Sequence, residues 1–323
     1  MRNVYAIVCL LAGLWLFAAC GREEMPDAES GTPLVDAEQL PGEVNVIDTE
    51  EDTSELEDSM ELIADEDVAE EISYFDPHGM TVESRILAPK GYKRTEAEEG
   101  SLLEYLRSFP VKEDGSPVLL YDGNKKWNQD AHVAVMELPI EDADLQQCAD
   151  SIMRMYAEYF LASGQEERIS FHFTNGFEAD YTKWRDGYRI KVDGNQVSWV
   201  QSAGYDDSYE TFVKYLRMVF SYAGTLSMDA EAEPIVVEEM QVGDVFLKGG
   251  SPGHVVMIVD VCENEEGKRA FLLAQGYMPA QEFHILKNPA SEADPWYYEE
   301  DIVYPFVTPE YVFDEGSLQK LNY

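Results

Sequence analysis

Positive charge, histidine and cysteine are scarce in this sequence of 323 residues, and each shortage limits what the protein can be. Lysine and arginine number 23 against 64 aspartate and glutamate residues, a formal net charge of −41 at pH 7. A chain this acidic repels nucleic acid, so we expect no nucleic-acid partner. The five histidines include no HExxH motif or other pair at metal-ligand spacing, so we expect no metal and no other cofactor.

Long hydrophobic runs are also rare, and the single clear one lies at the N-terminus, from Val4 to Phe17. Arg2 precedes it, and two alanines and Cys20 follow it. A basic residue, a short apolar core and small residues are typical of a secretory signal peptide, and the run is short for a transmembrane helix. Residues 1–20 are therefore predicted to be a signal peptide.

The end of this segment, LFAAC at residues 16–20, resembles a bacterial lipobox. The resemblance implies cleavage before Cys20 and acylation of its thiol, for example with palmitate, so that Cys20 would anchor the protein to a membrane. Glu23 and Glu24 resemble signals that send some bacterial lipoproteins to the outer surface. We therefore expect a lipid-anchored protein of the cell envelope, at the outer membrane or the cell surface.

The segment that follows, residues 21–75, has almost no aromatic residue with which to build a core. Residues 21–71 hold twenty aspartate and glutamate residues and one basic residue, Arg22. This composition predicts a disordered acidic stalk.

The remaining residues, 76–323, are not divided by a Pro/Gly/Ser-rich gap, and we expect one α+β domain with a mainly antiparallel sheet and packed helices. Periodicity and turn residues predict strands at 81–87, 118–121, 132–138, 168–174, 188–192, 197–201, 254–262 and 269–277, and helices at 101–109, 144–162 and 208–223.

Cys148 lies on the apolar face of the predicted helix 144–162, for which Asp144 is the expected N-cap. One interpretation makes it a small core residue, as most free cysteines are. The other makes it a nucleophile, because a helix N-terminus lowers the pKa of a thiol. Gln147, the preceding residue, carries an amide that could donate to an oxyanion.

His254 opens the first of two adjacent apolar strands and follows a glycine-rich loop at residues 249–253. Counting outward from the turn in antiparallel register brings the level of His254 opposite residues 275–277, so we expect Gln275 or Tyr277 to face the imidazole. The loop is expected to leave one face of the ring open.

Other residues are weaker candidates. Trp127, Trp184 and Trp199 could bind a glycan or a peptide, although tryptophans in such positions more often cover the sheet or belong to the core. His284 lies in a loop-rich stretch and could be a second site group, with a surface or capping role as the alternative. Cys148 and Cys262 are not expected to form a disulfide.

The text GDV followed by GHVVMIVD, at residues 243–245 and 253–260, resembles the histidine half of the NlpC/P60- and CHAP-type papain-like cysteine hydrolases. The resemblance implies a papain-like frame in the C-terminal half, with Cys148 as nucleophile, His254 as base and Gln275 as orienting residue. The usual nucleophile text of these families is absent, and the insertion between Cys148 and His254 is long.

A wider set of segments, including LQQCADSIMRMYAEY, GGSPGHVVMIVDV and FLLAQGYMPAQEFHILKNP, resembles a bacterial lipoprotein family known as the domain of unknown function 4846. This resemblance spans nearly all of the body and implies no activity. Two hypotheses stay open: a thiol hydrolase or amidase acting on cell-envelope peptide, or a non-catalytic lipoprotein that binds a glycan, a peptide or a protein.

Overall fold

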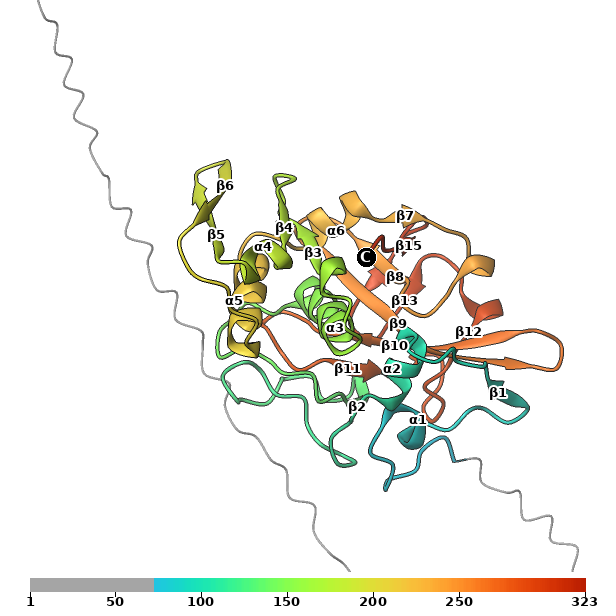
Figure 1. The fold of residues 1–323 in the computed structure, drawn as a ribbon. Helices are drawn as coiled ribbons and strands as arrows, with labels where there is room; N and C mark the ends of the chain where they lie inside the picture. Colours follow the sequence, from blue (N-terminus) through green and yellow to red (C-terminus); the bar gives the residue numbers. More distant parts are fainter. Residues whose placement is uncertain (1–72) are drawn as a thin grey trace, which may run out of the picture. The chain divides into compact units, whose positions relative to one another are not determined.

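An antiparallel sheet forms the centre of the structure, a computed structural model that describes residues 73–323 (Figure 1). Its strands follow the order β2-β11-β10-β9-β8-β15-β7, with β1 beside the end of β9 and β12 beside β10. They are β1 (Tyr92–Arg94), β2 (His132–Val135), β7 (Glu233–Pro234), β8 (Val245–Lys248), β9 (His254–Asn264), β10 (Arg269–Gln275), β11 (His284–Leu286), β12 (Tyr297–Tyr298) and β15 (Leu318–Lys320). The predicted signal peptide and almost all of the predicted stalk lie outside the described residues.

The hairpin β9–β10 confirms the two strands predicted from their apolar runs, with β10 ending two residues earlier than expected. Nearly all of its side chains are buried, because both faces of this part of the sheet are covered. The pairing shifts by one residue between Leu272 and Leu273. Such a β-bulge changes which residues of the two strands meet beyond it.

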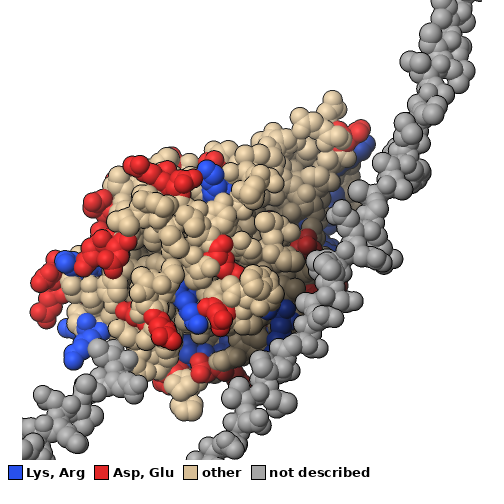
Figure 2. All heavy atoms as spheres, turned by 180° about the vertical axis from the view of Figure 1, so that it is seen from behind, with Lys and Arg blue, Asp and Glu red and all other residues tan. Residues whose placement is uncertain are grey.

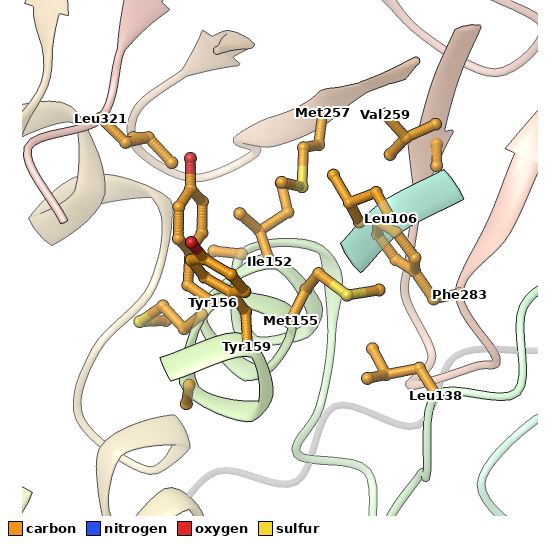
Figure 3. Close-up of a cluster of buried hydrophobic side chains, with 14 of the residues drawn as sticks. Leu106, Leu138, Ile152, Met155, Tyr156, Tyr159, Met257, Val259, Phe283 and Leu321 are labelled. Carbon is orange, nitrogen blue, oxygen red and sulfur yellow. The ribbon is translucent and has the colours of Figure 1, made fainter. Parts of the chain in front are cut away.

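The two faces of β9 pack against different elements. Val255, Met257 and Val259 point to the face that holds helix α3 (Cys148–Ala162), where Figure 3 shows Met257 and Val259 near Ile152 and Met155 of the helix. The alternate residues belong to a second cluster on the opposite face, which includes aromatic residues of the short hairpin β13 (Phe306–Val307) and β14 (Val312–Phe313). Side chains alternate along a strand, so neighbouring residues of β9 serve different cores.

The first described segment corrects one predicted strand. Residues 81–87 contain the short helix α1 (Val82–Arg85) instead, because Thr81 and Ser84 form a reciprocal capping box. The next helix, α2 (Leu102–Ser108), confirms the prediction, with the hydroxyl of Ser101 accepting from the backbone N–H of Glu104.

The strand predicted at 118–121 is also wrong. This segment makes only isolated bridges, Leu119 with Lys125 and Leu120 with Gln281, and is otherwise a loop. The strand predicted at 132–138 is present as β2 but ends at Val135.

The remaining elements lie between α3 and β8 in the sequence. The predicted strands at 188–192 and 197–201 are confirmed as a hairpin, the predicted helix at 208–223 is present but shorter, and the strand predicted at 168–174 shrinks to three residues. The elements are β3 (Ser170–His172), β4 (Glu178–Asp180), α4 (Tyr181–Arg185), β5 (Tyr188–Asp193), β6 (Gln196–Gln201), α5 (Tyr209–Phe220) and α6 (Thr225–Glu231), with 3-10 turns at Glu166–Arg168 and Val237–Glu239. A further 3-10 turn, Glu299–Asp301, follows β12.

The described body is therefore a mixed α+β fold with a mainly antiparallel sheet, as the sequence predicted. Among residues 73–323, no helix is long and apolar enough to cross a membrane. Acidic side chains occur at several separate places on the face seen in Figure 2, with basic side chains between them.

Candidate functional site

Helix α3 begins four residues later than predicted, and this makes Cys148 its first residue. Asp144 is not the cap: its carboxylate accepts from the backbone N–H of Ala280 at 2.7 Å and from the side chain of Gln147 at 3.1 Å. The N-cap residue is Gln147, and its backbone N–H donates to the carboxylate of Asp150, the third residue of the helix, at 3.1 Å. The amide of Gln147, the oxyanion candidate, is thus held by Asp144 in this structure.

The thiol of Cys148 is buried, at 5% exposed, and lies among backbone N–H groups. Those of Ala149, Cys148 itself and Val255 are close enough to lower its pKa. Burial first, and the charge of Asp150 second, outweigh them and raise the thiol pKa to about 12. Burial also raises the pKa of Asp150 to about 8, so at neutral pH that carboxyl is mostly protonated and repels a thiolate less. The resting group is a neutral thiol.

A pocket of about 460 Å³ lies at the N-terminus of α3. Cys148, Gln147 and Asp150 line it on the helix side, and the glycine-rich loop from Gly250 to Gly253 lines it opposite. The segment joining α5 to α6 and the first residue of α6, Thr225, contribute further walls. The predicted loop therefore borders a space that reaches the thiol.

The end of β10 approaches the same helix terminus very closely. A Cβ added at Gly276 would lie 2.4 Å from the side-chain oxygen of Ser151 and 3.0 Å from the carbonyl oxygen of Gln147. Only glycine fits at such a distance. The close approach holds Gln275, one residue earlier, near the first turn of α3.

His254 is the first residue of β9 and is 1% exposed. The expectation that one face of its ring is open is wrong, because aromatic rings surround it: Tyr277 at 4.7 Å and Tyr311 at 4.9 Å between ring centroids, with Phe313 further away at 6.0 Å. Two of these rings come from the segment 311–313, far along the chain. Burial lowers the pKa of His254 to about 4, so the ring is neutral at pH 7.

The sequence predicted Gln275 or Tyr277 opposite His254, and the contact with Gln275 is present. Nε2 of His254 lies 2.7 Å from Oε1 of Gln275. The amide nitrogen of Gln275 donates to Oε2 of Glu310 at 2.7 Å, and Glu310 forms a buried ion pair with Lys126. Asn128 donates to the other carboxylate oxygen of Glu310. A connected polar network therefore lies behind the histidine.

His284 belongs to the same network and is not on the surface. It is the first residue of β11, fully buried, and directly opposite Gln275 in the sheet. Its Nδ1 lies 2.8 Å from the carbonyl oxygen of Glu282 and its Nε2 lies 3.4 Å from Nζ of Lys126. The prediction of a loop residue with a surface or capping role is wrong, because β11 is short and pairs on both sides.

The side chains of Cys148 and His254 lie on opposite faces of the sheet at the start of β9. The sulfur lies by the backbone N–H of Val255, one residue after His254. The side chain of Val255 points toward α3, whereas that of His254 points to the opposite face. Among residues 73–323, no hydrogen bond joins the thiol to the imidazole. The sulfur thus lies beside the residue after His254, and the catalytic pairing of Cys148 with His254 stays a prediction.

The two described cysteines are both free and buried. Cys262 lies near the other end of β9, opposite Ala270 and Arg94. The eight residues that separate it from His254 span about 26 Å in a strand. Cys148 beside Val255 is accordingly far from it, and the two thiols occupy unrelated environments.

The three tryptophans do not share one environment. Trp127 is 92% exposed, next to the buried Lys126. Trp184 is buried, and its indole N–H donates to the carbonyl of Thr211, so its role is in the core. Trp199 is half-buried and packs against Phe177. Of the three, Trp127 alone presents most of its surface to solvent.

The sequence analysis missed Lys126 and Glu310 as site residues. No motif in the sequence marks Lys126, and Glu310 lies in an acidic chain where a single glutamate carries little information. The contacts of Lys126 with Glu310 and of Glu310 with Gln275 depend on loops that fold over the sheet. No periodic pattern in the sequence marks such loops.

One comparison with known proteins gives a match. The family model described as "Domain of unknown function (4846)" matches residues 82–320. No curated protein and no solved structure matches the chain.

Proposed function

The chain belongs to the family of the domain of unknown function 4846, and we propose that it is a cell-envelope thiol hydrolase or amidase with a papain-like arrangement. In this proposal Cys148 is the nucleophile, His254 the base and Gln275 the orienting residue. The observation that carries it is the position of Cys148 at the first residue of α3, where it lines a pocket and its sulfur lies beside the backbone N–H of Val255, the residue that follows His254.

The chemistry follows from the protonation states. With Nε2 of His254 donating to Gln275, the neutral ring has its lone pair on Nδ1. The thiol proton would pass to Nδ1 as the sulfur attacks an amide carbonyl, and the C–N bond would then break as the histidine returns the proton to the leaving amine. Water would hydrolyse the resulting thioester and restore the thiol.

The backbone N–H groups around the sulfur could also stabilise an oxyanion in the pocket. Those of Cys148 and Ala149 belong to the first turn of a long helix, where donors are free of intrahelical partners. Donors at such a position stabilise an oxyanion on the attacked carbonyl. With Gln147 held by Asp144, we assign this role to the backbone N–H groups.

The test is hydrolysis of a mixture of cell-wall peptides, followed by mass spectrometry of the fragments. We expect new amine and carboxyl termini with the wild type, none with Cys148→Ser, and undiminished cleavage with Cys262→Ser. Cys262 is a matched control because it is equally buried and free but lies far along β9. Cleavage that survives in Cys148→Ser would refute the proposal.

The lipid anchor is part of the same proposal. Cys20 lies outside the described residues, and the LFAAC segment supports it as the acylation site. A fatty-acid analogue should label the wild type in growing cells and fail to label Cys20→Ala. Labelling of Cys20→Ala would mean that the lipid is attached to another residue and that Cys20 is not the membrane anchor.

A second candidate function is a non-catalytic envelope protein that binds a glycan, a peptide or a protein partner. The observations that favour it are the raised thiol pKa and the placement of His254 on the face away from α3. If it holds, iodoacetamide should modify Cys148 no faster in the wild type than in His254→Ala, because the imidazole would not act on the thiol.

A further inference from the structure

The side-chain amide of Gln275 has different partners at its two ends. Its oxygen lies 2.7 Å from Nε2 of His254, and its nitrogen lies 2.7 Å from the carboxylate of Glu310. The nitrogen also lies 3.5 Å from Nε2 of His284. A carboxylate accepts hydrogen bonds and cannot donate them, so it distinguishes between the two ends of the amide.

The orientation of this amide decides the tautomer of His254. With the oxygen toward the ring, Nε2 must carry the proton and Nδ1 is left as the base. If the amide turned over, its NH₂ group would donate to Nε2 and the proton would move to Nδ1. The amide oxygen would then face Glu310, and two acceptors would lie against each other in a buried site.

His284 favours the same orientation. Its Nδ1 donates to the carbonyl of Glu282, so its Nε2 is an acceptor in the neutral ring. The same burial that lowers the His284 pKa well below its usual value keeps that ring neutral. Gln275 therefore has acceptors, Glu310 and His284, on its nitrogen side.

Glu310 is itself fixed in place. It pairs with Lys126, whose side chain is 3% exposed, and accepts from Asn128 at 3.1 Å. It lies in the turn of the β13–β14 hairpin, next to Tyr311, which covers the His254 ring. The β13–β14 hairpin therefore places both the Glu310 carboxylate and the Tyr311 ring close to His254.

We infer that Glu310 is a positioning residue: anchored by Lys126, it orients the Gln275 amide and thereby holds His254 in the tautomer with a free Nδ1. This inference rests on the proposed function, since the base is needed for the thiol reaction. Glu310 reaches no thiol and touches no substrate in this scheme, and acts through Gln275 alone.

The test reads the tautomer directly. Long-range proton–nitrogen NMR spectra of the full-length chain, labelled with 15N-histidine, report which ring nitrogen carries the proton. The His254 signals are assigned by their loss in His254→Asn. We expect a protonated Nε2 in the wild type and a detectable population with a protonated Nδ1 in Glu310→Ala.

Glu282→Ala is the matched control. Glu282 is a similarly buried carboxylate that pairs with a lysine, Lys112, but it does not contact Gln275 through its side chain. We expect no change of the His254 tautomer there. In the hydrolysis assay, Glu310→Ala should lower kcat by about 10²-fold, the lower end of what a general base contributes, with KM little changed.

Glu310→Ala leaves Lys126 without its partner and can unfold the chain. The double variant Lys126→Met/Glu310→Ala removes both charges and still frees the amide, so it serves when the single variant does not fold. An unchanged tautomer in the folded variant overturns the inference. A changed tautomer in a protein that cleaves nothing supports the positioning role and refutes the hydrolase function instead.

Discussion

The two faces of the sheet at the start of β9 are built in different ways. On one face, α3 supplies a continuous apolar surface and the first residues of the helix border the pocket. On the other, the network that contains His254 joins polar and aromatic groups from four separate parts of the chain: the loop at Lys126, the end of β10, the start of β11 and the β13–β14 hairpin.

This difference separates two kinds of stability. The α3 face is held by apolar burial, which is tolerant of exact geometry and adds up over many contacts. The histidine face is held by a few buried polar groups, each of which needs its partner. The second face is therefore the more sensitive to a single substitution.

The largest effect is expected on the histidine face. Lys126→Met leaves the carboxylate of Glu310 buried without its cation, and breaking a buried ion pair typically costs about 3–5 kcal/mol. Urea unfolding measures the loss. The double variant Lys126→Met/Glu310→Gln should recover most of it, because no uncompensated charge remains. A single variant as stable as the wild type would mean that the network does not stabilise this face.

On the α3 face, Ile152→Ala should cost about 2–5 kcal/mol, since the side chain is fully buried in the main core. Because Ile152 lies on the other face of the sheet, we expect this loss to be independent of the polar network around His254. Combined with Lys126→Met, the two losses should add to within about 0.5 kcal/mol, as expected for sites without shared partners. A clear departure from additivity in urea unfolding would show that the sheet couples its two faces.

The elements that a local pattern defines could be predicted from the sequence. The apolar runs of β9 and β10, the Ser101 N-cap of α2 and the hairpin β5–β6 all appear where the sequence placed them. The Glu104 half of the predicted capping box does not form, because that carboxylate accepts from the backbone N–H of Gly100. Counting register from the short turn placed His254 opposite residues 275–277, and its side chain contacts both Gln275 and Tyr277.

The errors have physical reasons that lie outside local pattern. The predicted strand at 81–87 was displaced by a capping box between Thr81 and Ser84, and the predicted helix cap at Asp144 was lost to a long-range bond with Ala280. The burial of His254 and the roles of Lys126 and Glu310 depend on loops that pack over the sheet. Tertiary contacts of this kind leave no periodic signal.

A further effect, on the α3 face, concerns pH. Burial raises the pKa of Asp150 from 3.8 to about 8, so between these values the folded chain holds a proton that the unfolded chain releases. The contribution of this group to stability is therefore greatest below pH 4 and is lost as the pH rises toward 8, by at most about 1.4 kcal/mol per pH unit.

Asp150→Asn keeps an oxygen that can cap α3 and removes the titration. The difference in melting temperature between the variant and the wild type should therefore grow in favour of the variant from pH 5 to pH 8. Asp144→Asn is the control, since Asp144 is at the same helix end and shows no such burial. Parallel pH profiles of Asp150→Asn and the wild type would contradict the buried, protonated state.

The smallest effect on stability is expected outside both faces, at Trp127. Its indole is 92% exposed, so Trp127→Ala should change the free energy of unfolding by no more than about 0.5 kcal/mol. Trp184→Ala, which removes a buried ring, should cost about 3–5 kcal/mol in the same experiment. The contrast makes Trp127 a clean probe of binding, because a loss of affinity for cell-wall glycan or peptide in a fully stable variant would come from the exposed indole itself. Unchanged affinity would remove Trp127 from the binding candidates, and a large loss of stability would mean that the indole packs against the body.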